Sequence, residues 1–177
     1  MKKALTILIL FIIFLFIYFL QANFFQGFTI AGVMPNLFVI LILFISLFAG
    51  IKLSLPFAII SGLYLDIIMG KSIGITAIML GVVSVLGVYF DKSFSKESKI
   101  TIILMVAAVS GIFEIGSYIL KVAQQSIYVE IDQFVIKLLI EIFYNIILTI
   151  ILYPLIQKWG YKMENIFKGN RILTRYF

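Results

Sequence analysis

The stretch Gly62-Leu-Tyr-Leu-Asp66-Ile-Ile-Met-Gly70-Lys-Ser-Ile-Gly74 places a carboxylate in the middle of a hydrophobic segment and brackets it with glycines every four residues. An ionisable side chain at bilayer depth costs about 2.5–3.5 kcal/mol on insertion scales, so it usually faces protein or water rather than lipid. Glycines at i, i+4 and i+8 fall on one face of a helix and allow a neighbouring backbone to come close. The stretch therefore predicts a polar, tightly packed helix contact inside a membrane bundle.

The composition is typical of an integral membrane protein. Of the 177 residues, 63% are hydrophobic, whereas soluble domains are about 45–50% apolar. The length suits one transmembrane domain covering residues 1–177. The chain has no cysteine and no histidine, which excludes disulfides and imidazole metal ligands, and we expect no metal or other cofactor.

The apolar runs predict an all-α bundle of about six transmembrane helices. A crossing takes about 20 apolar residues, and about 17 at the lower limit. The expected spans are 4–25, 36–51, 53–69, 73–90, 100–120 and 134–156. The first run is longer than the hydrophobic region of a signal peptide, so we expect it to stay uncleaved. The third span is short and follows the second directly, so it could instead be a re-entrant segment.

The distribution of cations predicts the orientation. With six spans and both termini inside, eleven of the fourteen lysines and arginines face the cytoplasm, and only Lys71, Lys121 and Lys137 lie outside. This asymmetry is the positive-inside pattern. The basic tail 157–177 also carries aromatic residues, as an interfacial segment does. The net charge of +6 therefore indicates anionic lipids as partners, and no nucleic acid.

Asp66 has two possible roles. It could form an ion or proton site, or it could make a structural hydrogen bond that fixes the third helix. A second membrane acid or a nearby cation would favour transport, and the sequence around Asp66 offers neither. The structural hydrogen bond, to an adjacent backbone or a hydroxyl group, is the favoured interpretation.

Two further polar stripes lie in the fifth and sixth spans. Spacings of three and four place each stripe on one helix face. Lys137 and Glu141 can pair along the sixth helix, and Asn145 can bond to a neighbouring helix. These stripes are expected to fix helix packing, or alternatively to form a small cavity or an interaction face for another membrane protein. The stripes are Ser110, Glu114, Ser117 and Lys121 in the fifth span, and Lys137, Glu141, Asn145, Thr149 and Tyr153 in the sixth.

The sequence lacks the residues that known intramembrane proteases use. Serine–histidine proteolysis and the HExxH zinc motif both need histidine. Intramembrane aspartyl proteolysis needs two membrane aspartates, and Asp66 is the only one within an expected span. We therefore expect a protein that is not an enzyme.

Five local features together carry a family resemblance. They are Lys2-Lys3 before the first span, Met34-Pro35-Asn36-Leu37 before the second, Gly50-Ile51-Lys52 after it, the stretch from Gly62 through Asp66, Gly70 and Gly74 to Ala77, and Asn145 with Tyr153-Pro154-Leu155 in the last span. With them, the chain resembles the MreD family of bacterial rod shape-determining proteins over nearly its whole length. Family members often have Asp after the proline. Asn36 stands there in this chain, so a formal charge is not needed at this position or the position matters less here.

The resemblance implies a fold similar to the substrate-binding subunits of energy-coupling factor transporters. It also implies a scaffold in the bacterial cytoplasmic membrane that docks MreC and helps to regulate lateral peptidoglycan synthesis. MreB and the pair of RodA with its class B penicillin-binding protein are expected as indirect partners. The residues expected in helix packing or docking are Gly62, Asp66, Gly70, Gly74, Glu114, Lys137, Glu141 and Asn145.

Two other functions stay open from the sequence. One is a vitamin-binding subunit of an energy-coupling factor transporter, which usually carries an Ala-xxx-Ala motif on its first helix. The segment 4–20 contains a single alanine, which argues against that function. The other is a small ion-coupled transporter that would use Asp66 and Glu114 as titrating groups.

Overall fold

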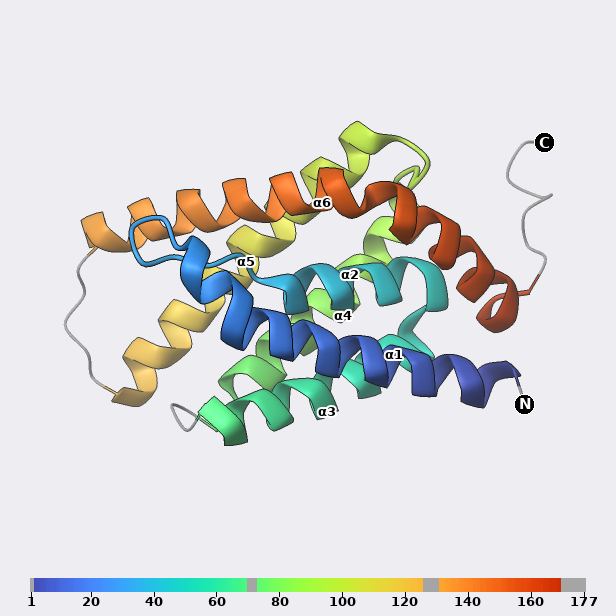
Figure 1. The fold of residues 1–177 in the computed structure, drawn as a ribbon, viewed down its shortest axis with the longest axis horizontal. Coiled ribbons are helices and arrows are strands. Elements are labelled where there is room, and N and C mark those ends of the chain that lie inside the picture. The colour runs from blue at the N-terminus through green and yellow to red at the C-terminus, as the bar shows by residue number, and fades with distance from the viewer. Residues whose placement is uncertain (1, 70–72, 126–130, 170–177) are drawn as a thin grey trace.

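A computed structural model describes residues 2–69, 73–125 and 131–169. Within these residues the chain forms six α-helices, as the sequence predicts, and Figure 1 shows them as one bundle. Between α1 and α2 the chain passes through a short π-helical turn, η1 (Leu20–Phe24), and a 3-10 turn, η2 (Phe25–Phe28). The helices are α1 (Lys2–Phe19), α2 (Leu37–Ala49), α3 (Ile51–Met69), α4 (Ile75–Ser93), α5 (Lys99–Gln125) and α6 (Ile131–Phe167).

Five segments of the described chain are long and apolar enough to cross a bilayer, and α2 is the exception. The 13 residues of α2 span only about 20 Å at the usual helical rise. The segment 53–69, considered above as re-entrant, lies in the unbroken 19-residue helix α3. Pro56 lies in the second turn of α3, where it removes one intrahelical hydrogen bond, to the carbonyl group of Lys52, without ending the helix. The short element is thus the second span rather than the third.

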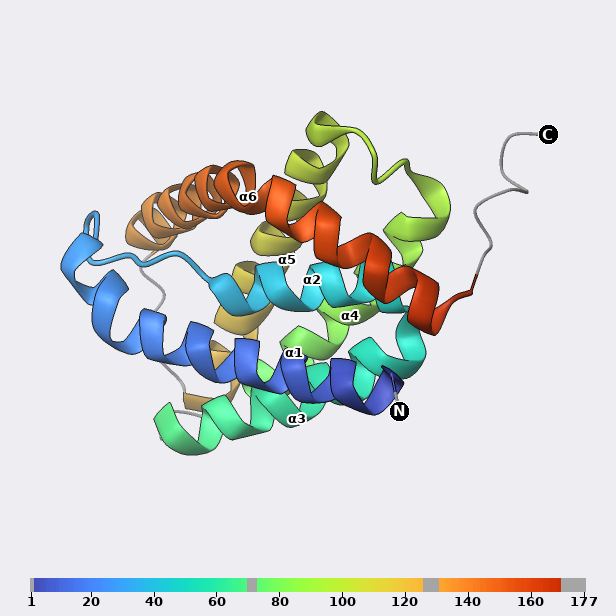
Figure 2. The same cartoon turned by 45° about the vertical axis from the view of Figure 1, so that its right-hand side comes forward.

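Helix α2 forms the centre of the bundle. It is apolar on every side, as interior helices are, and all its residues except Leu41 are buried. The other five helices all pack against it. In both Figure 1 and Figure 2, α2 lies between α6 and α1 with α4 beside it. The hydrophobic core is therefore built around one short helix.

Helix α1 has the opposite character. Only Leu10 and Phe14 are fully buried in it, Ile17 and Tyr18 are partly buried, and most of its other apolar side chains are exposed. The ring of Phe14 contacts Phe38 of α2 and Tyr64 of α3, with centroids 5.4 Å and 5.7 Å apart. One face of α1 thus attaches it to the bundle, and the other faces outward.

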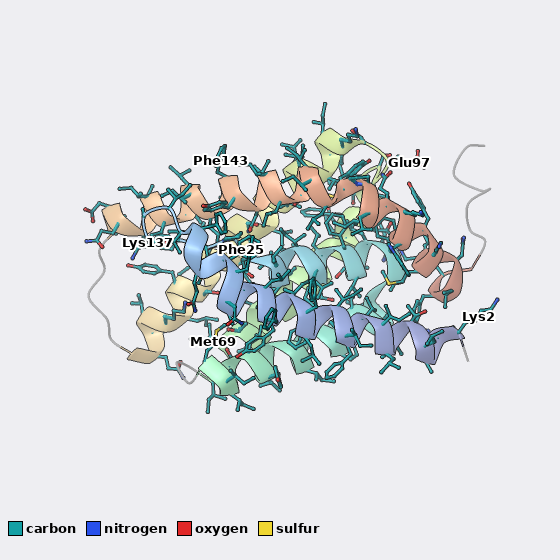
Figure 3. All side chains as sticks on the ribbon, in the orientation of Figure 1. Lys2, Phe25, Met69, Glu97, Lys137 and Phe143 are labelled. Atoms are coloured by element: carbon teal, nitrogen blue, oxygen red, sulfur yellow. The ribbon has the colours of Figure 1, made fainter. Side chains whose placement is uncertain are left out.

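The helices alternate in direction. The first turn of α1 and the last turn of α6 lie at the same end of the bundle (Figure 1). Figure 3 places Lys2 and Glu97 toward this end and Lys137 and Met69 toward the other. An even number of passes produces this arrangement. That the end with Lys2 faces the cytoplasm remains a prediction from the charge distribution.

Helix α6 is longer than its expected span of 134–156. Its 37 residues extend about 55 Å, whereas the hydrocarbon core is about 30 Å thick. Residues 157–167, expected to begin a separate interfacial tail, continue this helix and pack against α2. A Cβ atom at Gly160 would lie 2.5 Å from the ring of Phe48, so glycine permits this contact. Residues 170–177 of the expected tail lie outside the described residues.

Candidate functional site

The carboxylate of Asp66 binds the N-terminus of α4. Its Oδ2 accepts hydrogen bonds from the backbone N–H groups of Gly74 (2.8 Å) and Ala77 (3.3 Å), and its Oδ1 accepts one from Thr76 (3.2 Å). The first N–H groups of a helix have no partner inside that helix, and the positive end of the helix dipole favours an anion there. Asp66, on α3, therefore supplies the hydrogen-bond acceptor for the N–H groups at the start of the neighbouring helix α4.

Gly62 allows α3 and α4 to come into backbone contact. A Cβ atom at this position would lie 2.4 Å from Cα and 2.7 Å from N of Ala77. Backbone atoms cannot move aside as a flexible side chain can. Together with Asp66 one turn later, Gly62 defines what we call the α3–α4 seam, which also includes Thr76, Ala77 and Gly74.

Gly74 has a different role from the expected one. The sequence predicts that Gly62, Gly70 and Gly74 share one helix face, but α3 ends at Met69, so Gly74 lies beyond it. Gly74 is the N-cap of α4 with a φ of +96°, and a Cβ atom there would meet nothing within 4 Å. It supplies a left-handed turn that other residues rarely adopt. Gly70 lies outside the described residues.

Asn145 connects three helices in the interior. Its Nδ2 donates to Ser110 Oγ on α5 at 2.9 Å, and its Oδ1 accepts from the backbone N–H of Asn36 at 2.8 Å. The Oδ1 of Asn36 in turn accepts from the N–H of Val39 at 3.3 Å and caps α2. Asn145 is 0% exposed. The amide predicted to bond across helices thus joins α6 both to α5 and to the start of α2.

Glu141 and Glu114 face each other one turn away. Helices α5 and α6 run antiparallel, with Asn145 opposite Ser110 and the ring of Phe134 stacked on Tyr118 at 4.1 Å. This register brings the carboxyl groups of Glu114 and Glu141 into direct interaction, and Lys121 exerts a weaker attraction on both. We call Ser110, Glu114, Glu141 and Asn145, with Asn36, the α5–α6 seam.

The expected pairing of Lys137 with Glu141 is not formed. Among the ion pairs within the described residues, none involves Lys137, which is exposed. Glu141 is buried because its side chain turns toward α5. Lys137 lies one turn closer to the end of the bundle, where a long cationic side chain can reach water.

The α5–α6 seam is only partly satisfied. Three buried polar atoms on these helices find no hydrogen-bond partner among the described residues: Glu141 Oε1, Ser117 Oγ and Tyr118 Oη. By contrast, both oxygens of Asp66 accept hydrogen bonds. The two seams therefore differ in how completely their polar groups are paired.

A third group of polar residues, which the sequence did not reveal, lies at the C-terminal end of α2. Lys96 and Lys168 both donate to the carbonyl oxygen of Leu47, at 3.4 Å and 2.6 Å. The same ammonium groups pair with Asp91 at 2.8 Å and 2.6 Å, and Lys96 also pairs with Glu164 at 2.5 Å. Cations near the C-terminus of a helix interact favourably with the negative end of its dipole.

These four residues, the α2 charge cluster, come from two separate parts of the chain, 91–96 and 164–168. Burial lowers the pKa of the Lys168 ammonium group, and its hydrogen bond to Asp91 opposes that shift. The mixed charge of the 91–99 region is visible in the sequence. Its convergence with residues 164 and 168 on α2 follows only from the packing of α6.

The described residues do not gather three acidic, histidine or cysteine side chains in a geometry that could hold a metal ion. The polar groups instead connect helices: Asp66 joins α3 to α4, Asn145 joins α2, α5 and α6, and the charge cluster joins α2, α4 and α6. The arrangement is suited to fixing the relative positions of helices.

Comparison with known proteins places this bundle in a family. No curated protein and no solved structure matches the chain, so the expected likeness to transporter subunits and the vitamin-transport alternative gain no support. The family model for rod shape-determining protein MreD matches residues 1–163, nearly the whole chain. The residues that carry the resemblance in the sequence all lie within this match. The chain therefore belongs to the MreD family of rod shape-determining proteins.

Proposed function

We propose that this protein is a membrane scaffold subunit of the bacterial cell-elongation complex, which docks MreC and helps to regulate lateral peptidoglycan synthesis. Membership of the MreD family establishes a role in rod shape determination, and the five apolar helices establish a multi-pass membrane protein. The proposal adds a location in the cytoplasmic membrane with both termini inside. It also adds contact with MreB and with the RodA–class B penicillin-binding protein pair through MreC.

The observation that supports the scaffold function is that the polar side chains connect helices to one another. Asp66, Asn145 and the α2 charge cluster all connect helices to one another, and the last two hold α2 at its two ends. A bundle fixed in this way presents a constant outer surface to partners. The seam residues Gly62, Asp66, Gly74, Glu114, Glu141 and Asn145 then act in docking through the shape of the bundle rather than by direct contact.

Helix α1 is the surface that we propose for MreC. Its outward face carries large apolar side chains such as Leu8, Ile12 and Phe16, which are 55%, 56% and 59% exposed. Only Leu10 and Phe14 of the helix are fully buried, with Ile17 and Tyr18 partly buried against the core. A helix with so little internal packing can exchange lipid for a partner helix at little cost to the fold.

The test uses the absence of native cysteine. Because the chain has no other thiol, a single cysteine introduced at Ile12 is its only site for a photoreactive maleimide. In native membranes we expect cross-links from Ile12→Cys to MreC, and none from Ile151→Cys on α6, which is equally lipid-accessible at 64% exposed. Equal cross-linking from both positions would remove α1 as the docking surface.

Co-purification in mild detergent tests the function as a whole. Recovery of MreC together with wall-synthesis enzymes is the expected result. Recovery of an ATP-binding coupling module without MreC would contradict the scaffold function, whatever the outcome at α1.

A further inference from the structure

A pocket opens between the first turn of α5 and the middle of α6. Its volume is about 720 Å³, within the range of about 300–1,000 Å³ that is usual for ligand sites. The residues that define its chemistry are Lys99 and Ile103 on α5 and Ile150, Pro154, Lys158 and Tyr161 on α6. None of them belongs to the α3–α4 seam, the α5–α6 seam or the α2 charge cluster.

The pocket has a cationic end and an apolar end. Lys99 lies at the start of α5 and Lys158 lies toward the end of α6, so both are near the end of the bundle that carries most of the cations. Ile103 lies about 6 Å deeper along α5, and Ile150 about 12 Å deeper along α6, by helical rise. The polarity of the pocket therefore changes along the bundle axis, as it does across one leaflet of a membrane.

The wall near Lys99 is fixed by hydrogen bonds. Tyr153 Oη donates to the carbonyl oxygen of Glu97 at 2.8 Å, and Gln157 Nε2 donates to that of Lys96 at 3.3 Å. The ammonium group of Lys99 lies 5.7 Å from the centre of the Tyr153 ring. These contacts hold one side of the pocket in place without a ligand, and they place Lys99 at its edge.

A bend in α6 lies next to the pocket. Figures 1 and 2 show that α6 changes direction in its second half. Pro154 lies within this helix and has no N–H for the carbonyl group of Ile150, and its ring crowds the preceding turn. Helices bend at such positions. The pocket lies beside this proline, at the bend of α6.

We propose that this pocket binds the headgroup of an anionic phospholipid, with its phosphate between Lys99 and Lys158 and an acyl chain along Ile103 and Ile150. Basic pockets between transmembrane helices are known to bind acidic headgroups. The first turn of α5 adds the positive end of its helix dipole on the same side. This site is distinct from a general attraction of the basic tail to the membrane, and it does not depend on the scaffold function.

The experiment measures phospholipid retention by native mass spectrometry of the full chain, released from nanodiscs that contain phosphatidylglycerol and phosphatidylcholine. The variant K99Q/K158Q removes the two pocket cations. The control variant K92Q/K162Q removes two exposed cations outside the pocket lining and gives the same net charge. We expect the pocket variant to retain phosphatidylglycerol about tenfold less well or worse, and the control to stay within about twofold of the native chain.

Three results would overturn the proposal. Equal losses in the two variants would show a non-specific charge effect, and unchanged retention in K99Q/K158Q would show that the lipid binds elsewhere. The third is thermal stabilisation of the native chain by inorganic phosphate alone to the same extent as by phosphatidylglycerol, which would assign the site to free phosphate. A further variant, I150W, fills the apolar end while keeping both lysines. It should also reduce lipid retention, and native-like retention by folded I150W would contradict the placement of the acyl chain.

Discussion

The α3–α4 seam and the α5–α6 seam solve the same problem, a polar group within an apolar bundle, in different ways. In the first, both oxygens of Asp66 accept backbone N–H groups, and the backbones meet at Gly62. In the second, Asn145 bonds to the Ser110 side chain and to one backbone N–H, two carboxyl groups face each other, and Glu141 Oε1 has no partner among the described residues. In the first seam both carboxylate oxygens are paired, whereas the second retains unused hydrogen-bonding capacity.

This difference has a physical consequence for tolerance to substitution. Backbone groups cannot change identity, so the partner of the α4 N-terminus must be an acceptor at the position of Asp66. A side-chain pair can be replaced by another pair of similar shape. We therefore expect most substitutions in the α3–α4 seam to destabilise the protein strongly. In the α5–α6 seam we expect the loss of stability to depend on the side chain that is introduced.

The largest effect is expected for Asp66→Leu. The change leaves the N–H groups of Gly74, Thr76 and Ala77 without their acceptor, and a buried backbone donor without a partner costs about 1–3 kcal/mol. Accumulation in the membrane should fall to a small fraction of the native level, while Asp66→Asn, which keeps one acceptor oxygen, should be intermediate. Ile67→Leu, at a position 69% exposed, is the control. Native levels of Asp66→Leu would show that the seam does not need its carboxylate.

Asn145→Leu should have the next largest effect. It removes the bonds to Ser110 and to the N–H of Asn36, and such bonds contribute roughly 0.6–2 kcal/mol each within a bilayer. The melting temperature in mild detergent should decrease clearly, whereas Ile147→Leu on the same helix, 36% exposed, should leave it unchanged. If Asn145→Leu melted like the control, the start of α2 would not depend on α6.

Gly62→Ala and Gly81→Ala should have opposite effects. A methyl group at Gly62 meets the backbone of Ala77, and overpacking of this kind costs about 1–3 kcal/mol. At Gly81 the nearest atom to a new Cβ is Leu55 Cδ1 at 3.7 Å, so the better helix propensity of alanine should stabilise the protein by up to about 1 kcal/mol. Thermal unfolding of the two variants side by side measures the difference. A loss of stability at both positions would argue against the close contact at Gly62.

The smallest effect is expected for Glu141→Gln. The amide keeps the shape of the side chain and removes one of the two facing carboxyl groups. The free energy of unfolding should change by about 1 kcal/mol or less, and cell shape in a complemented strain should be retained. A loss of function with normal accumulation would indicate that the charge or proton of Glu141 is used, and would favour an ion-coupled mechanism over a scaffold.

The sequence was sufficient to predict those features that depend on one helix. The apolar runs predicted the helices, and the four-residue spacing of Glu141, Asn145 and Thr149 predicted the buried face of α6, which the structure confirms. The hydrogen bonding of Asp66 to an adjacent backbone was likewise expected. A single carboxylate in an apolar run has few other ways to be accommodated.

Features that depend on which helices are neighbours could not be predicted. Asn36 and Asn145 are 109 residues apart, and no local pattern connects them. The α2 charge cluster and the contact of Gly160 with Phe48 depend on α6 reaching beyond the membrane core and lying across the end of α2. For Gly74 the error was local: four-residue spacing continued past Met69, although the helix did not.

The complete burial of α2 has a consequence for biogenesis. Chains are synthesised from the N-terminus, so α2 leaves the ribosome before α4 and α6, which will cover it. Asn145, which accepts from the N–H of its N-cap residue Asn36, and Lys168, one of the cations at its C-terminal end, are among the later residues to emerge. A nascent chain therefore carries a short apolar helix most of whose final neighbours have not yet been synthesised. The interior of this protein closes only after most of the chain has been translated, and until then the insertion machinery or lipid must shelter its central helix.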